Sequence, residues 1–124
     1  ILIVVQGAGG IGNEVGFAFA ESGVNSVLFA DLDGEAATEA AEESRKLATN
    51  PAYKAFGIKA DLTKVDWVQS MVDAAVKEFG AIDYCINAAG VDVASYIPFA
   101  DTLIDDYDRV LDINTKGVFI KKTK

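Results

Sequence analysis

Histidine is absent from this chain of 124 residues, and cysteine occurs once, at Cys85. Histidine is the side chain that most often acts as a general base near neutral pH and most often binds a metal ion. Its absence excludes a histidine-catalysed reaction, and with a single cysteine a zinc site is not expected. One cysteine also excludes an internal disulfide, so we expect a cytoplasmic setting.

Basic residues are also few, because 11 Lys and Arg stand against 19 Asp and Glu and the formal net charge is −8. Nucleic acids and anionic membranes are bound by clustered Lys and Arg, so neither is expected as a partner. No apolar run approaches the roughly 20 residues that a membrane-spanning helix needs. Hydrophobic residues still make up 51% of the chain, which is enough for a core, and a length of 124 residues corresponds to one domain at most.

Apolar runs and helical stretches alternate along the chain. Strands are expected at 1–5, 26–30, 55–60 and 82–87, and helices at 11–22, 34–49, 64–79 and from about Thr102 onward. This alternation is typical of a parallel sheet covered by helices. With right-handed crossovers, it predicts a three-layer α/β fold, a Rossmann-type doubly wound sheet with strand order 3-2-1-4.

The last expected helix carries one stripe of residues at helical spacing: Leu103, Tyr107, Val110, Asn114 and Val118. The fourth strand would form an open apolar edge, which proteins avoid. The first residues already read as a buried strand. We therefore expect residues 1–124 to be the N-terminal part of a single dinucleotide-binding domain that is truncated at both ends.

A glycine-rich turn joins the first strand to the first helix. Gly7, Gly9 and Gly12 fit the pattern G-x-G-x-x-G, in which the glycines allow a tight turn, close approach of the backbone to a pyrophosphate, and close helix–strand packing. The amides of a helix N-terminus favour such an anion. Similar turns also occur for packing alone, but here the preceding strand and the following helix are both predicted.

Asp31 ends the second strand, 19 positions after Gly12. A carboxylate at this place accepts hydrogen bonds from the adenosine ribose hydroxyls and repels a 2′-phosphate. No Arg or Lys lies in the glycine turn or beside Asp31 in the sequence, so NAD is predicted rather than NADP. The alternative is a solvated turn acid at the start of a helix.

Asp61 ends the third strand and allows two readings. Its carboxylate could reach the exocyclic amine of an adenine, or it could interact with the dipole of the helix that follows. The spacing alone does not separate the two. Thr63 and Asp66 have the spacing of a capping box for that helix.

The motif Asn87-Ala88-Ala89-Gly90 after the fourth strand completes a recognisable set. Together with Gly10-Ile11-Gly12, Asp31, Asp61-Leu62 and Asn114, it resembles the short-chain dehydrogenase/reductases over nearly the whole chain. The resemblance implies that Asn87 steadies the central sheet and that Asn114 is catalytic, holding a lysine through water in a proton relay. The cofactor-binding residues expected from motif and resemblance are Gly7, Gly9, Gly10, Ile11, Gly12, Asp31, Leu32, Asp61, Leu62, Asn87, Ala88, Ala89, Gly90 and Ile113.

Two departures from the family pattern stand out. The family turn is usually Thr-Gly-x-x-x-Gly-x-Gly, and here either Gln6 replaces its first glycine or the loop is one residue short. The family also uses a Ser and a Tyr-x-x-x-Lys pair. That pair is missing, because the residues four positions after the four tyrosines are Gly57, Ala88, Ala100 and Leu111.

The resemblance implies an NAD(P)-dependent oxidoreductase that transfers hydride between nicotinamide and a small alcohol or ketone. It also implies a homodimer or homotetramer. Residues 1–124 alone are expected to be inactive, because the catalytic Ser-Tyr-Lys part is not among them. Asn114 could instead be a structural residue with a satisfied amide. The alternatives for the whole chain are a non-catalytic truncated dinucleotide-binding or regulatory protein, and an interaction domain that recruits a partner.

Overall fold

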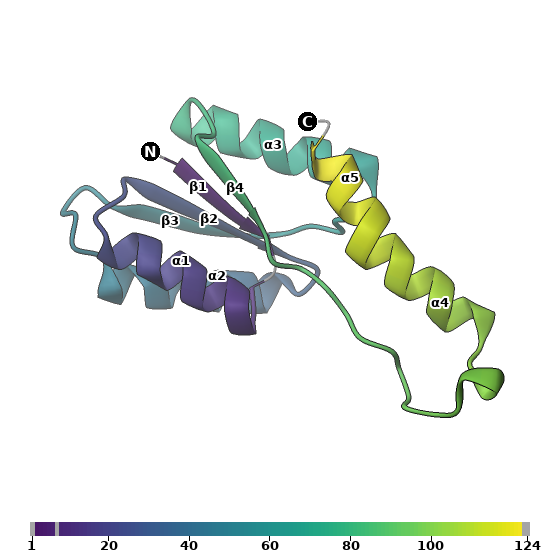
Figure 1. Ribbon diagram of the computed structural model, residues 1–124. Coiled ribbons are helices and arrows are strands. Elements are labelled where there is room, and N and C mark those ends of the chain that lie inside the picture. Colours follow the sequence, from purple (N-terminus) through teal and green to yellow (C-terminus); the bar gives the residue numbers. More distant parts are fainter. Residues whose placement is uncertain (1, 7, 123–124) are drawn as a thin grey trace.

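A parallel sheet of four strands forms the centre of the computed structural model, which describes residues 2–6 and 8–122 (Figure 1). The strands are β1 (Leu2–Gln6), β2 (Ser26–Asp31), β3 (Lys54–Lys59) and β4 (Tyr84–Asn87). Their order is β3-β2-β1-β4, which is the order expected from the sequence. The register places Val4 opposite Leu28 on one side and Cys85 on the other. The predicted α/β class is confirmed.

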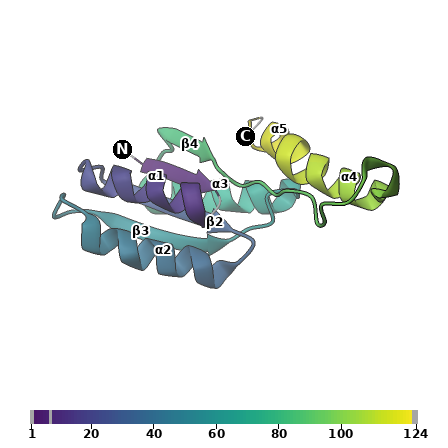
Figure 2. The same cartoon turned by 60° about the horizontal axis from the view of Figure 1, so that its bottom comes forward.

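Helices cover both faces of the sheet (Figures 1 and 2). Two of them, α1 (Gly10–Glu21) and α2 (Gly34–Leu47), lie on one face, and α3 (Val65–Phe79) lies on the other. The observed strands and these three helices differ from the expected ranges by at most two residues at either end. Among the described residues, no helix is both long and apolar enough to cross a bilayer.

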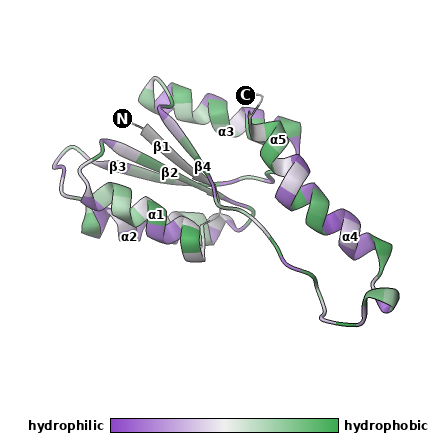
Figure 3. Cartoon of the chain, in the orientation of Figure 1, coloured by the Kyte–Doolittle hydropathy of each residue, from purple (hydrophilic) through white to green (hydrophobic). Residues whose placement is uncertain are grey.

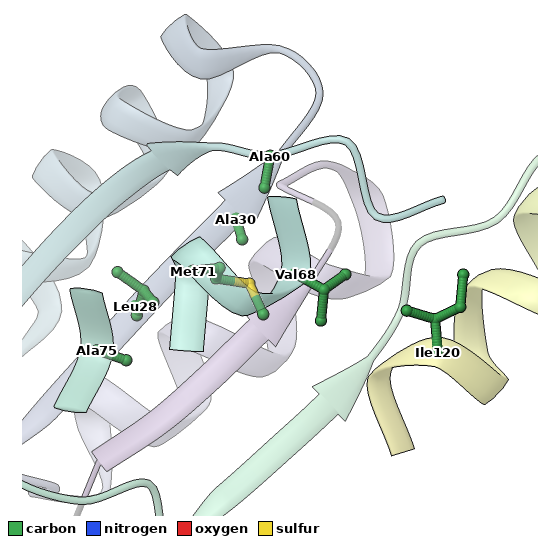
Figure 4. Packing of buried hydrophobic residues seen from close by; sticks show 7 residues of the cluster. All are labelled: Leu28, Ala30, Ala60, Val68, Met71, Ala75 and Ile120. Carbon is green, nitrogen blue, oxygen red and sulfur yellow. The ribbon is translucent and has the colours of Figure 1, made fainter. Parts of the chain in front are cut away.

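The second strand is buried on both sides, as its unbroken apolar sequence requires. Val27 and Phe29 belong to the cluster under α1 and α2. Leu28 and Ala30 belong to the opposite cluster, which Figure 4 shows; its other buried members are Ala60, Val68, Met71, Ala75 and Ile120. The doubly covered strand fixes the positions of the loops that follow β1 and β2 at the carboxyl edge of the sheet.

The last part of the chain differs from the single helix expected from about Thr102. It consists of a 3₁₀ turn η1 (Phe99–Asp101), helix α4 (Ile104–Leu111), a π-helical turn η2 (Asp112–Lys116) and helix α5 (Gly117–Lys122). A π turn bonds each residue to the fifth one along, so it shifts the helix phase. The π turn interrupts the expected stripe: Leu103, Tyr107 and Asn114 are exposed and Val110 and Val118 are partly buried, whereas the buried residues, among those of this segment whose burial is described, are Gly117 and Ile120.

Helix α4 projects away from the sheet in both views (Figures 1 and 2). Its hydrophobic residues are nevertheless large, and they show as green segments along the projecting helix in Figure 3. Ile104 is 70% exposed and Tyr107 is 57% exposed. Within the described chain, α4 is therefore positioned by side-chain hydrogen bonds rather than by a hydrophobic core.

Candidate cofactor-binding site

A cleft of about 730 Å³ opens at the carboxyl edge of the sheet. This volume is within the range of small-molecule sites, and the carboxyl edge is where open α/β sheets bind their ligands. The loops after β1, β2, β3 and β4 contribute to it, and α4 and η2 close one side. The predicted residues that line it are Gly9, Asp31, Leu32, Asp61, Leu62, Ala88, Ala89, Gly90 and Ile113.

The other predicted residues lie beside the cleft rather than on its lining. Gly10 and Ile11 begin α1, and Ile11 is 79% exposed. Gly12 is buried, and Asn87 ends β4 opposite Gln6. Asn114 is in η2 and is described below. Gly7 lies outside the described residues.

The glycine turn presents open backbone to the cleft. Ala8 is buried, whereas Gly9 is exposed and no atom lies within 4 Å of the place where a Cβ of residue 9 would stand. Gly10 has φ +45°, in the left-handed region that favours glycine. The first turn of α1 contains no acidic residue. Because the first amides of a helix have no partner within it, this turn fits the diphosphate of a dinucleotide.

Asp31 fastens the glycine turn to the end of β2. Its Oδ2 accepts a hydrogen bond from the Ala8 amide at 2.8 Å, and its Oδ1 accepts one from the Asp33 amide at 2.8 Å. Asp33 in turn caps α2, since its side chain accepts hydrogen bonds from the amides of Glu35 and Ala36. A carboxylate has about four lone-pair sites, so Asp31 keeps acceptor capacity for a ribose hydroxyl.

The tertiary structure brings two cations closer to Asp31 than the sequence suggests. Lys59 stands opposite Asp31 in the register of β2 and β3. Arg109 lines the same cleft as Asp31 although 78 positions separate them in the chain. Lys and Arg are therefore absent from the neighbourhood of Asp31 only along the sequence. In the fold, strand pairing places Lys59 opposite Asp31, and the last crossover places Arg109 in the same cleft.

Asp61 makes an Asx turn before α3. Its Oδ1 accepts hydrogen bonds from the Thr63 amide at 3.0 Å and from the Thr63 hydroxyl at 2.6 Å. The predicted capping box of Thr63 and Asp66 is wrong, since Lys64 is the N-cap of α3 and makes no side-chain cap bond, and the Thr63 hydroxyl bonds back to Asp61. The Thr63 hydroxyl is the main cause that lowers the pKa of the Asp61 carboxyl; desolvation opposes it, and the Thr63 amide and the charge of Lys64 lower the pKa further.

Replacement of Thr63 by valine is expected to raise the pKa of Asp61 toward its ordinary value. The stabilisation from this bond is present above the ordinary carboxyl pKa and is lost as the pH falls through the lowered pKa of the folded protein. An NMR titration of the Asp61 carboxyl carbon measures the shift. Thr38→Val is the matched control, because the Thr38 hydroxyl bonds to the carbonyl of Gly34 on an exposed helix surface. An unchanged Asp61 pKa in Thr63→Val would contradict the assignment.

Asn114 holds the segment that follows the Asn-Ala-Ala-Gly motif. Its Oδ1 accepts a hydrogen bond from the Val91 amide at 2.8 Å, and its Nδ2 donates one to the Val91 carbonyl at 2.7 Å. The side-chain amide is thus satisfied by backbone, although the residue is exposed. This contact fits the structural reading of Asn114, and the proton-relay role stays a prediction.

Several residues of the cleft were not predicted as cofactor-binding residues: Ala60, Thr63, Val91, Arg109 and Asp112. Arg109 precedes Ile113 by four positions, so helical spacing from Ile113 was the signal that could have found it. The π turn between them weakens that signal. Val91 and Thr63 follow predicted motifs directly, and extending each motif by one or two residues would have included them.

The comparisons with known proteins agree with this geometry. A family model for short chain dehydrogenases matches residues 1–123. The chain is 40% identical over 117 residues to the short-chain dehydrogenase fogB of Aspergillus ruber, which covers 94% of this chain and 43% of the relative. It is 29% identical over 118 residues to glucose 1-dehydrogenase 2 of Bacillus subtilis, covering 95% of this chain and 44% of that protein.

Solved structures give the same result. An NAD⁺-bound xylitol dehydrogenase matches with a TM-score of 0.88 at 32% identity, over 98% of this chain and 45% of that one. A short-chain type dehydrogenase/reductase from Mycobacterium marinum matches with a TM-score of 0.85 at 29% identity, over 98% and 46%. The chain spans less than half the length of these relatives. The glycine turn, the acids at the strand ends and the Asn-Ala-Ala-Gly segment thus meet on a fold shared with these enzymes, and the chain belongs to the short-chain dehydrogenase/reductase family.

Proposed function

We propose that this chain is the N-terminal, cofactor-binding portion of an NAD(P)-dependent oxidoreductase that acts on a small alcohol or ketone. The observation that carries the proposal is the cleft where the open glycine turn, Asp31, Asp61 and the Ala88–Gly90 segment meet. Proteins of this family bind NAD(P), and one structural neighbour contains NAD⁺. We further propose a cytoplasmic protein that forms a homodimer or homotetramer.

Each part of the cleft fits one part of a dinucleotide. The turn of Gly9, Gly10, Ile11 and buried Gly12 would hold the diphosphate at the N-terminus of α1. Asp31 would accept hydrogen bonds from the adenosine ribose, with Leu32 beside it. The adenine would be held by Leu62 and Ile113 and by the Asp61 carboxylate, which would accept a hydrogen bond from its exocyclic amine.

The remaining half of the cofactor would lie against the Asn-Ala-Ala-Gly segment. Asn87 would steady the end of β4, and Ala88, Ala89 and Gly90 would face the nicotinamide ribose. The cofactor supplies the hydride chemistry when bound, and the residues of this chain bind and orient it. Asn114 is proposed to hold a lysine through water in the proton relay of the complete protein. Residues 1–124 contain no Tyr-x-x-x-Lys pair and are proposed to be inactive by themselves.

We propose NAD as the preferred cofactor, with NADP less favoured. Asp31 lies where a 2′-phosphate would meet a carboxylate, and this repulsion opposes NADP. Calorimetric titration of the complete natural protein with each dinucleotide tests the proposal directly. Saturable binding of NAD that is tighter than binding of NADP is the expected result. Absence of binding by either would leave the alternative of a protein without dinucleotide chemistry.

Replacement of Gly9 by alanine is expected to weaken NAD binding about tenfold or more while the protein stays folded. The added Cβ meets no protein atom within 4 Å, so it would project into the space where the diphosphate approaches the backbone. Displaced hydrogen bonds to a charged group are each worth about 1.5–3 kcal/mol. Calorimetry measures the affinity, and a thermal melt checks the fold.

Ala18→Ser serves as the control for Gly9→Ala, because it likewise adds one atom at an exposed position, but in α1 and away from the cleft. It should leave NAD affinity unchanged. If Gly9→Ala binds NAD as tightly as the unmodified protein does, the diphosphate does not lie against this turn.

A further inference from the structure

Arg109 and Asp106 form an ion pair on α4 beside the cleft. The Arg109 Nη2 atom lies 2.9 Å from Asp106 Oδ1, and Arg109 Nε lies 3.2 Å from the same oxygen. The two residues are three positions apart and share one side of the helix. Both are partly buried, as is Val110, whereas the other hydrophobic residues of α4, Ile104, Tyr107 and Leu111, are exposed. The pair is therefore directed toward the body of the molecule.

The pair bonds the backbone of the loop that follows β4. Arg109 Nη2 also donates a hydrogen bond to the Asp92 carbonyl at 2.7 Å. The Asp106 carboxylate accepts one from the Ala94 amide, at 3.1 Å to Oδ2 and 3.3 Å to Oδ1. Together with the contacts of Asn114 to Val91, side chains of α4 and η2 thus reach backbone groups from residue 91 to residue 94.

A further acid, Asp92, makes hydrogen bonds within the loop that follows β4. The Asp92 carboxylate accepts hydrogen bonds from the Val93 amide and from the Tyr96 hydroxyl. Residues 92–100 are otherwise exposed, so hydrogen bonds rather than a core hold this segment near α4. A loop with few buried apolar contacts opens readily unless such bonds fix it.

This clamp, formed by Arg109 and Asp106 with the backbone groups of Asp92 and Ala94 that they bond, borders the proposed cofactor cleft. Gly90 and Val91 from the loop, and Arg109 and Ile113 from the helical segment, line the same cleft. Its other charged lining residues are Asp31, Asp61 and Asp112, so Arg109 is the one cation among the described residues of the lining. Without a partner, the Arg109 guanidinium would be attracted to these three carboxylates. Its ion pair with Asp106 holds it in one orientation.

We propose that Arg109 and Asp106 are positioning residues for the dinucleotide, which hold the Gly90–Ala94 segment against α4 and so set the width of the cleft opposite Gly9 and Asp31. This inference rests on the proposed function of the cleft. The guanidinium contacts a carboxylate and a carbonyl at once through a planar array of donors, which lysine cannot reproduce. The clamp therefore depends on the shape of the side chain and not on its charge alone.

The test compares Arg109→Gln, Arg109→Lys and Asp106→Asn in the complete natural protein. Arg109→Gln is expected to raise the Kd for NAD, and the KM for NAD where turnover is measurable, about tenfold, with kcat changed much less. Arg109→Lys should not restore the affinity, since the charge returns without the second contact. Combining Arg109→Gln with Asp106→Asn should weaken binding no further than one substitution does, because both break the same clamp.

Glu43 and Lys46 supply the matched control. They form an ion pair of the same spacing on α2, at 2.8 Å and away from the cleft. Glu43→Gln with Lys46→Gln should leave the Kd for NAD unchanged. Hydrogen exchange supplies a second readout that needs no ligand: the Ala94 amide should be protected in the unmodified protein and lose protection in Asp106→Ala, which leaves no side-chain oxygen to accept it.

The possible failures are distinguishable. If the unmodified protein binds neither NAD nor NADP, the proposed function fails. If it binds NAD and Arg109→Gln binds equally well, the positioning inference is overturned. If a lower folded fraction, as judged by the melting temperature, accounts for the whole loss of affinity, the positioning inference is overturned too. Unchanged exchange of the Ala94 amide in Asp106→Ala shows that the clamp does not exist in solution.

Discussion

Replacement of Asp31 by alanine is expected to weaken NAD binding about tenfold to hundredfold and to improve binding of NADP relative to NAD. Hydrogen bonds from ribose hydroxyls to a charged acceptor are worth about 1.5–3 kcal/mol, and removing the carboxylate also removes its repulsion of a 2′-phosphate. The structure adds a second cause, because Asp31 holds the Ala8 amide of the glycine turn at 2.8 Å. Titration calorimetry with both dinucleotides measures the change.

Asp31→Asn separates these two causes. An asparagine keeps one oxygen that can accept the Ala8 amide, but it carries no charge. It should therefore lose the discrimination against NADP while it retains more of the NAD affinity than alanine does. The neighbouring Asp33→Asn is the control, since Asp33 caps α2 and does not line the cleft. Tighter binding of NADP than of NAD by the unmodified protein would contradict the charge argument.

Replacement of Gly57 by alanine is expected to destabilise the fold by about 3 kcal/mol, near the upper end of the usual penalty for overpacking. A Cβ at this position of β3 would lie 2.3 Å from the Ala37 carbonyl carbon and 2.4 Å from the Thr38 nitrogen. These atoms are backbone of α2, so no side chain can rotate away and the helix must shift from the sheet. The free energy of unfolding from urea denaturation measures the effect.

Gly9→Ala provides the opposite pattern and is the control for this prediction. Gly57→Ala should lower stability and leave the NAD affinity of the folded protein unchanged, because Gly57 does not line the cleft. Gly9→Ala should lower affinity and leave stability nearly unchanged. A Gly57→Ala protein within about 1 kcal/mol of the unmodified stability would show that α2 and β3 pack less closely than described.

Local patterns were sufficient to predict most of the fold. The apolar runs of β1 and β2 are bounded by residues that favour turns, such as Gly12, Gly23 and Asp31, which lie at fixed positions relative to the runs. The periodicity of apolar residues and the spacing of motifs depend only on residues close together in the chain, so both can be recognised without knowledge of the tertiary contacts. The strand order followed from the doubly wound, Rossmann-type pattern with right-handed crossovers. The same reasoning placed the glycine turn and the acids of β2 and β3 at one edge of the sheet.

The final helical segment was predicted less well. A single stripe from Leu103 to Val118 assumed one uninterrupted helix, and the π turn at Asp112–Lys116 breaks that period. Gly117 ends this turn buried, where a Cβ would lie 3.3 Å from the carbonyl oxygens of Asp112 and Leu62. Close approach to the loop after β3, some fifty positions earlier, is a cause that no local pattern contains.

The amino-acid sequence by itself determined the alternation of strands and helices, the glycine turn and the acids at the strand ends, since each depends on residues a few positions apart. Only the tertiary structure decided which distant groups meet there. Lys59 stands opposite Asp31 because β2 and β3 pair in that register. Arg109 and Asp106 bond the backbone of Asp92 and Ala94 because α4 lies beside the loop that follows β4. These contacts depend on how whole elements pack, because a hydrogen bond forms only where the fold brings donor and acceptor within about 3 Å.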